Sequence, residues 1–431
     1  MTATSPAHRA IEAVWRIESA KVIAHVARVV RDVGLAEELA QDALLAALEH
    51  WPRTGVPDNP GAWLTTTARH RALDHLRQRA LHMRKHEQIG HDLDALEAHV
   101  VPDFVDGLDA ARQDDIGDDL LRLVFIACHP VLSRDARVAM TLRLLGGLTT
   151  AEIARAFLVP EPTIAQRIVR ARRTLGAARV PFEVPGPQAR TARLASVLEV
   201  IYLIFNEGYA ATAGSDWMRP ALCEEALRLG RTLAGLMPQE SEVHGLVALM
   251  EIQASRTHAR IDAQGRPVLL PEQDRGRWDR LLIRRGLQAL ERAQESSGGG
   301  GAPGPYALQA ALAACHARAP SAAETDWARI AALYDALSRV MPSPVVELNR
   351  AVAVGMAAGP AAGLEIVDAL AADAALANYH LLPSVRGDLL QKLGRWDEAR
   401  AEFERAAGMT RNERERELLL ARARDAGAPR G

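Results

Sequence analysis

Along most of this chain, apolar residues recur at intervals of three and four, and few segments alternate with a period of two. Because an α-helix returns to the same side every three or four residues, this pattern predicts helices rather than strands. The clearest example covers residues 149–175, where Thr149 and Glu152 have the spacing of a capping box that begins a helix. Pro160 then interrupts the pattern, and Pro162 suits the first turn of a second helix. The chain is therefore predicted to be nearly all α.

The second helix of this stretch has one apolar and one basic face. Its apolar residues follow one another at spacings of four, three and four, and they are Ile164, Ile168, Ala171 and Leu175. The opposite face has no acidic residue and carries Thr163, Gln166, Arg167, Arg170 and Arg173. Two short helices joined by a tight turn, the second of them basic, are typical of a helix-turn-helix that enters the DNA major groove. The alternatives are a face that is merely solvated, or arginines (Arg172 and Arg179 included) that only clamp phosphates.

A second basic helix is predicted upstream, in NPGAWLTTTARHRALDHLRQRA (59–80). Its expected buried row consists of Leu64, Ala68, Ala72 and Leu76. Its basic residues surround a single Asp74, and they are Arg69, Arg71, Arg77 and Arg79. Like charges at this density repel one another, so this helix is expected to face a polyanion.

Two helices are predicted between Ala10 and Trp51, with a break at Asp32–Gly34. The second of them, AEELAQDALLAALEHW (36–51), is expected to direct four leucines inward, namely Leu39, Leu44, Leu45 and Leu48. This leaves an acidic patch on its outer side, formed by Glu37, Glu38, Gln41 and Asp42. The patch is either a solvated face or a docking surface.

The charge changes sign after the upstream basic helix. Residues 87–119 contain eleven acidic residues against a single Arg112, which predicts a flexible acidic tether. The tether is either a spacer or a segment that lies in a positively charged channel, as a nucleic acid would. The expected organisation is a loose tail over 1–9, a first domain over 10–80, an acidic linker over 81–113 and a second domain over 114–180.

Residues 181–431 are predicted to form a further helical domain in which helices recur as pairs. The pairs are 190–208 with 220–236, 239–259 with 274–293, 305–318 with 325–340, 344–358 with 361–371, and 379–393 with 396–407. In the last pair, small and apolar residues have tetratricopeptide (TPR) spacing, and they are Gly387, Leu390, Ala399, Phe403 and Ala406. The preceding pair repeats this spacing thirty-seven residues earlier. The Gly-rich stretch 296–305 is interpreted as a flexible loop inside the array, because no GK[ST] follows it.

Composition narrows the functional classes. A net charge of −2 excludes a uniformly basic nucleic-acid coat, so DNA binding has to come from local patches. Cys128, Cys223 and Cys315 are far apart and form no CxxC pair, which indicates no disulfide, metal site or cofactor. The N-terminal stretch lacks the apolar run of a secretory signal, and no segment is apolar enough to cross a membrane. We therefore expect a cytoplasmic protein.

Taken together, these motifs resemble the bacterial extracytoplasmic-function (ECF) sigma factors of the sigma-70 family. AEELAQDALLAALEHW is similar to their region 2.2, NPGAWLTTTARHRALDHLRQR to regions 2.3 and 2.4, and residues 136–175 to region 4. The resemblance covers about the first 180 residues, with the same order and a similar acidic linker. It implies a subunit, not an enzyme, that binds the beta and beta-prime subunits of core RNA polymerase and directs promoter-specific initiation.

The resemblance also assigns roles to individual residues. It implies contact with the polymerase for Glu38, Gln41 and Asp42. It implies recognition of the minus-35 DNA element for Thr163, Gln166, Arg167, Arg170 and Arg173. For the minus-10 element it implies Asp58, Asn59, Trp63, Arg69, His70, Arg71 and Arg77. The chain departs from many relatives at His70, where those relatives have Asn.

In the second half, strings such as IYLIFNEGY, LCEEALRL and PVVELNRAVAV resemble the ECF group with a TPR-like C-terminal extension, known as group 42. This resemblance implies that the extension regulates or supports activity, with a small protein bearing an Asp-Gly-Gly-Arg motif as its partner. Two other functions stay open: a polymerase-independent helix-turn-helix regulator whose array senses a ligand or protein, and an enzyme built on the C-terminal half.

The enzyme alternative depends on polar residues that would line a pocket beside Trp278 and Trp327. These residues are Asn206, Glu207, Asp274, Arg275, Asp326 and Asn349. In helical arrays, such residues more often cap helices or pair between neighbouring repeats.

Overall fold

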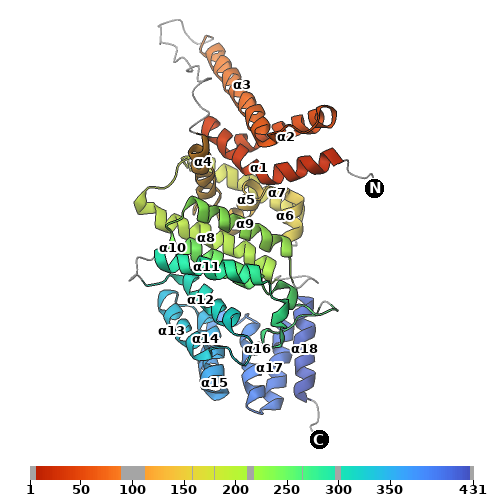
Figure 1. The fold of residues 1–431 in the computed structure, drawn as a ribbon, viewed down its shortest axis with the longest axis vertical. Coiled ribbons are helices and arrows are strands. Elements are labelled where there is room, and N and C mark those ends of the chain that lie inside the picture. The colour runs from red at the N-terminus through yellow and green to blue at the C-terminus, as the bar shows by residue number, and fades with distance from the viewer. Residues whose placement is uncertain are drawn as a thin grey trace. The chain divides into compact units, whose positions relative to one another are not determined.

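The computed structural model describes residues 6–88, 112–157, 159–178, 180–210, 218–264, 266–296 and 302–427. Across these ranges the regular secondary structure is helical, and β structure is limited to isolated bridges such as the antiparallel one between Ile261 and Pro267. The all-α prediction is therefore confirmed. The chain divides into two compact units, Met1–Val200 and Ile201–Gly431, which we describe separately (Figure 1).

The first unit begins with three helices that pack against one another: α1 (Pro6–Val30), α2 (Val33–Thr54) and α3 (Pro60–Gln88). α1 and α2 separate at Arg31, whose φ is 54°, and at Asp32, whose carboxylate caps α2 by accepting the Leu35 N–H at 3.0 Å. A break was predicted at Asp32–Gly34; the structure has it at Arg31 and Asp32, because α2 already includes Val33 and Gly34.

The buried side of α2 differs from the predicted row of leucines. Leu39 is buried and Leu44 and Leu48 are half-buried, but Leu45 is 56% exposed, so the prediction was wrong for Leu45. Alanines form the inner stripe instead, and they are Ala36, Ala40, Ala43 and Ala47. Leu45 is two residues after Ala43, and a helix turns by about 100° per residue, so Leu45 lies on the opposite side of α2 from this stripe.

The first unit continues with α4 (Arg112–Ala127), α5 (Arg134–Leu144), α6 (Thr150–Phe157) and α7 (Glu161–Ala177). Most of the predicted acidic tether lies outside the described residues. Its last part is helical, because α4 begins at Arg112. Asp119, which we expected in the tether, is buried and forms ion pairs with Arg28 at 3.2 Å and Arg122 at 2.5 Å.

The first unit also includes α8 (Pro187–Tyr209) as far as Val200. Ser196 Oγ donates to the Cys128 carbonyl at 2.7 Å, and Arg193 donates to the Phe125 carbonyl at 3.2 Å. These bonds attach α8 to the end of α4, so the compact unit extends beyond the boundary expected at residue 180.

The second unit consists of helices that pack on their neighbours along the chain. They are α9 (Pro220–Leu236), α10 (Ser241–Ala254), α11 (Arg280–Ser296), α12 (Pro305–Arg318), α13 (Trp327–Val340), α14 (Pro344–Ala358), α15 (Pro360–Leu370), α16 (Leu381–Lys392), α17 (Trp396–Met409) and α18 (Glu413–Gly427). Four short 3-10 turns lie between them: η1 (Thr257–Ala259), η2 (Leu270–Glu272), η3 (Arg275–Arg277) and η4 (Ala374–Leu376). The last four predicted pairs pack as pairs, and α18 is an additional helix packed on α17.

The TPR spacing in α16 and α17 has a packing explanation. Leu390, Ala399, Phe403 and Ala406 are fully buried. A Cβ atom on Gly387 would lie 2.8 Å from the Phe403 ring, so only glycine allows the α16 backbone to lie directly against that ring. This hairpin therefore has the TPR-like packing that the spacing predicted.

Candidate nucleic-acid interface

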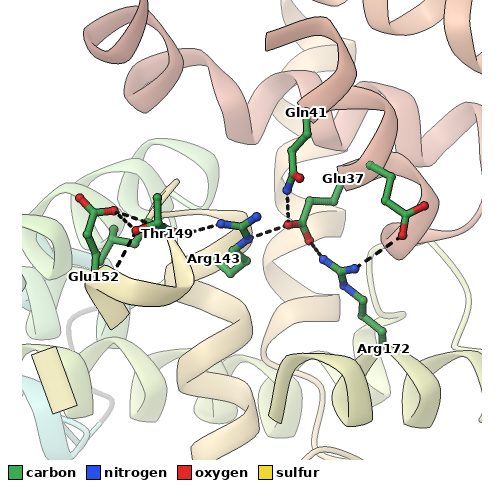
Figure 2. Close-up of polar contacts among 8 residues, drawn as sticks. Glu37, Gln41, Arg143, Thr149, Glu152 and Arg172 are labelled. Atoms are coloured by element: carbon green, nitrogen blue, oxygen red, sulfur yellow. Dashed lines mark hydrogen bonds and ion pairs between the residues drawn. The ribbon is translucent and has the colours of Figure 1, made fainter. Parts of the chain in front are cut away.

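α6 and α7 form the predicted helix-turn-helix. The Thr149 N–H donates to Glu152 Oε2 at 2.7 Å, and the Glu152 N–H donates to Thr149 Oγ1 at 3.1 Å (Figure 2). These reciprocal bonds are the capping box expected from the sequence. The Thr163 N–H donates to the Pro160 carbonyl at 2.9 Å, which closes the turn into α7.

The two faces of α7 are those predicted. Ile164, Ile168, Ala171 and Leu175 are buried, while Gln166, Arg170 and Arg173 are exposed on the outer face. Thr163 and Arg167 are half-buried, and Arg167 pairs with Asp135 of α5 at 3.0 Å. The expectation that no acid neutralises this face was therefore wrong for Arg167. The acid comes from a neighbouring helix, which the spacing within α7 cannot reveal.

α3 carries the second basic surface. Leu64, Ala68 and Ala72 form its buried row, and Leu76 is half-buried. On the outer side, His70, Arg71 and Arg77 are exposed and Arg69 is half-buried. Arg71 lies 3.5 Å from Asp42 of α2, and Arg77 lies 3.3 Å from Asp74. Arg71, which was predicted to contact DNA, therefore lies beside Asp42, which was predicted to contact the polymerase.

The loop before α3 presents short polar side chains. Asp58 and Asn59 are exposed, and Asn59 Oδ1 accepts the Ala62 N–H at 3.0 Å, so Asn59 caps α3. Trp63 packs edge to face on the buried Trp51, with ring centroids 5.4 Å apart. The Trp51 contact, which sequence reasoning missed, fixes the orientation of the Trp63 ring.

Glu37 occupies a different place from the one predicted. We expected it on the outer acidic patch, but it is only 1% exposed. Its carboxylate accepts Arg143 Nε at 2.6 Å, Gln41 Nε2 at 2.7 Å and a bond from Arg172 (Figure 2). Arg143 comes from α5 and Arg172 from α7, so one carboxylate of α2 joins both helices.

The other members of the acidic patch remain accessible. The Glu38 side chain is 68% exposed, and Gln41 and Asp42 are half-buried. Arg172 Nη1 lies 3.9 Å from Glu38 Oε1, so this arginine approaches two acids of α2. Arg172, considered in the sequence as a phosphate clamp, is an intramolecular partner of Glu37 in this structure.

Comparison with known proteins identifies the family. The sequence model of sigma-70 region 2 matches residues 16–81, and that of sigma-70 region 4 matches residues 122–175. The ECF RNA polymerase sigma factor SigC of Mycobacterium tuberculosis is 30% identical over 178 residues, or 41% of this chain and 88% of that protein. The chain belongs to the ECF RNA polymerase sigma factors.

Other relatives extend the comparison. The ECF sigma factor SigK of Mycobacterium ulcerans is 31% identical over 159 residues, or 36% of this chain and 78% of that protein. An uncharacterized Rhizobium meliloti protein, R00370, is 44% identical over 386 residues, or 89% of this chain and 88% of that protein. Residues 193–294 match a family of unknown function, DUF6596. R00370 therefore also aligns with much of the part of this sigma factor that follows region 4.

In the C-terminal unit of this sigma factor, four of the six polar residues considered for an enzyme site have structural partners: Glu207, Asp274, Arg275 and Asp326. Asp274 caps η3, Asp326 caps α13 by accepting the Arg329 N–H at 2.9 Å, and Glu207 pairs with Arg219. Arg275 donates to the carbonyls of His316 at 2.5 Å and Ala319 at 2.6 Å. These bonds agree with the capping interpretation and leave those side chains committed to the fold.

Two buried cysteines of the sigma factor, Cys128 and Cys223, have strongly raised pKa values. Burial raises the pKa of the Cys128 thiol to about 11 and that of Cys223 to about 12, so both stay protonated and unreactive near neutral pH. Across the described ranges, no group of three or more His, Cys, Asp or Glu is arranged to hold a metal ion. No described helix is both long and apolar enough to span a membrane.

Proposed function

We propose that this chain binds core RNA polymerase and directs it to promoters by recognising two DNA elements. The observation that carries the proposal is the pair of basic outer faces, one on α3 within region 2 and one on α7 within region 4. Phosphate neutralisation by such faces supplies affinity, and side chains that reach base edges supply sequence preference.

For the minus-35 element, we propose that α7 enters the major groove with Gln166, Arg170 and Arg173 foremost, because these side chains are exposed. An amide suits bidentate contact with adenine, and a guanidinium suits guanine. Arg167 and Thr163 lie at the edge of this surface, and Arg167 has to exchange Asp135 for DNA.

For the minus-10 element, we propose that α3 and its preceding loop hold the melted strand. Arg69, Arg71 and Arg77 supply positive charge, and His70 supplies a hydrogen-bonding ring where many relatives have Asn. Asp58 and Asn59 lie at the start of the helix, where an unstacked base would enter. The Trp51 contact holds Trp63 in one orientation, which favours a fixed wall for such a base.

For the polymerase, we propose contact through Glu38, Gln41 and Asp42 of α2 with the beta and beta-prime subunits. We further propose that the C-terminal unit regulates or supports activity, with a small Asp-Gly-Gly-Arg-motif protein as its candidate partner. Its TPR-like hairpins support this role, because stacked helical hairpins build extended binding surfaces.

The test is run-off transcription by the full chain with purified core polymerase, together with gel shifts in the presence and absence of core. We expect specific transcripts, and specific DNA binding only when core is present. Specific binding to duplex DNA without core, and no transcript with it, would instead support the polymerase-independent regulator. The candidate partner is tested by adding it to the same reaction.

A further inference from the structure

An exposed valine lies on the outer side of α7. Val169 is 63% exposed, whereas Ile164 and Ile168 on the inner side are 1% and 5% exposed. Valine is a weaker helix former than alanine, and its side chain stabilises a fold mainly when it is buried. Neither helix propensity nor packing within α7 therefore explains a valine at this position.

Val169 lies among the residues that we propose to contact DNA. A helix turns by about 100° per residue, so Arg173 and Gln166 lie about 40° and 60° from Val169 around the axis of α7. Arg170 lies about 100° away in the same direction. These three side chains are exposed. Val169 thus provides an apolar position beside an amide and two guanidinium groups.

The DNA major groove offers one apolar group to such a side chain, the C5-methyl group of thymine. The other atoms that distinguish the bases in this groove are hydrogen-bond donors and acceptors. A valine placed against the N4 amino group of cytosine would leave that donor without a partner, which is unfavourable. An aliphatic side chain on this face therefore suits thymine and disfavours cytosine at the same position.

We propose that Val169 contacts the C5-methyl group of one thymine in the minus-35 element and so selects thymine at that position. The inference rests on the proposed function and adds to it one base and the side chain that reads it. The positive charge of Arg170 and Arg173 favours DNA over an apolar protein surface as the occupant. An apolar surface would remove water from both guanidinium groups without offering them hydrogen bonds.

The methyl group sets the size of the expected effect. Loss of one buried methyl group should weaken binding about fourfold, which corresponds to about 0.8 kcal/mol. Val169→Ala should cause a similar loss, because the alanine side chain is too short to cover the methyl group. Val169 is exposed and alanine is the best helix former, so this substitution should leave the fold intact.

The test measures the affinity of the holoenzyme, formed from the full chain and core polymerase, for promoters selected from a random library. Each thymine of the minus-35 element, on either strand, is replaced in turn by deoxyuridine, which lacks only the C5-methyl group. We expect one replacement to weaken binding by the unmodified chain about fourfold and to have no effect on the Val169→Ala chain. The Val169→Ile chain keeps a branched aliphatic side chain and should still distinguish the two duplexes.

Val340→Ala is the matched control. Val340 is a 47% exposed valine at the end of α13, outside region 4. This variant should bind the thymine and deoxyuridine duplexes as the unmodified chain does. A loss equal to that of Val169→Ala would show that the effect is not specific to α7, and it would contradict the inference.

Three results would overturn the inference and leave the proposed function standing, because specific promoter binding persists in each. The unmodified chain could tolerate every deoxyuridine, or the selected minus-35 elements could contain no thymine on either strand. In the third result, the Val169→Ala chain still distinguishes thymine from deoxyuridine, so that another side chain reads the methyl group. If the unmodified holoenzyme bound no promoter specifically, the proposed function itself would fail, and this inference with it.

Discussion

Arg170→Ala tests whether α7 reads bases. Arg170 is exposed on the outer face of α7, and no ion pair joins it to an acid in the part of the chain that the structure describes. Its removal leaves no buried carboxylate without a partner, and alanine is the best helix former. We therefore expect the free energy of unfolding to change by less than about 0.5 kcal/mol.

The expected effect on DNA binding is much larger. A bidentate contact between arginine and guanine contributes about 1–3 kcal/mol of discrimination. At 1.4 kcal/mol per factor of ten, this is a loss of roughly 5-fold to 150-fold in the affinity of the holoenzyme for its promoter. The loss should be confined to promoters with the preferred base at one position, because on the others the arginine has no base contact to lose.

The assay is fluorescence anisotropy of holoenzyme on promoters selected from a random library, each carrying single substitutions in the minus-35 element. Arg134→Ala is the control, because it removes an equal charge from α5. An equal loss on every duplex, with the salt slope reduced by about 0.9, would show that Arg170 clamps a phosphate. No loss on any duplex would refute the assignment of this face to DNA.

Three further predictions concern stability and are checked by denaturant or thermal unfolding of the full chain. Thr149→Ala removes the capping box of α6 and should cost about 1 kcal/mol, whereas Thr66→Ala on the exposed side of α3 should cost little. Phe403→Ala leaves a cavity beside Gly387 and should cost about 3–5 kcal/mol; a loss below 1 kcal/mol would contradict the described packing. Burial, with Arg256 and Arg275 nearby, lowers the pKa of His316 to about 4, so the unfolded chain binds its proton first. Stability should thus fall as pH drops from about 6.5 toward 4, and His316→Gln should reduce that fall.

Local signals in the sequence predicted the helices well. The capping box at Thr149 and the interruption at Pro160 are as expected, and the helix predicted from residue 59 begins with an Asn59 cap; all three depend on bonds within a few residues. The TPR spacing succeeded for a related reason. It records a contact between two neighbouring helices, in which Gly387 lies against Phe403.

The predictions failed where a charged residue has a partner far away in sequence. Arg167 pairs with Asp135, and Asp119 pairs with Arg28. The sequence around these residues does not indicate either pair. The acidic count over 87–119 correctly described composition, but it gave no sign that its last residue enters a core. Charge alone does not distinguish a solvated acid from a buried one.

For Glu37, the spacing along α2 itself predicts a buried position. It lies three residues before the buried Ala40 and seven before the half-buried Leu44, so helical spacing places it toward the inner side of α2 rather than on the outer patch. An acid at such a position requires a cation, and α7 offers Arg172 beside the buried Ala171. That spacing identifies Glu37 as a residue with a partner, but only the fold shows that the partner belongs to region 4.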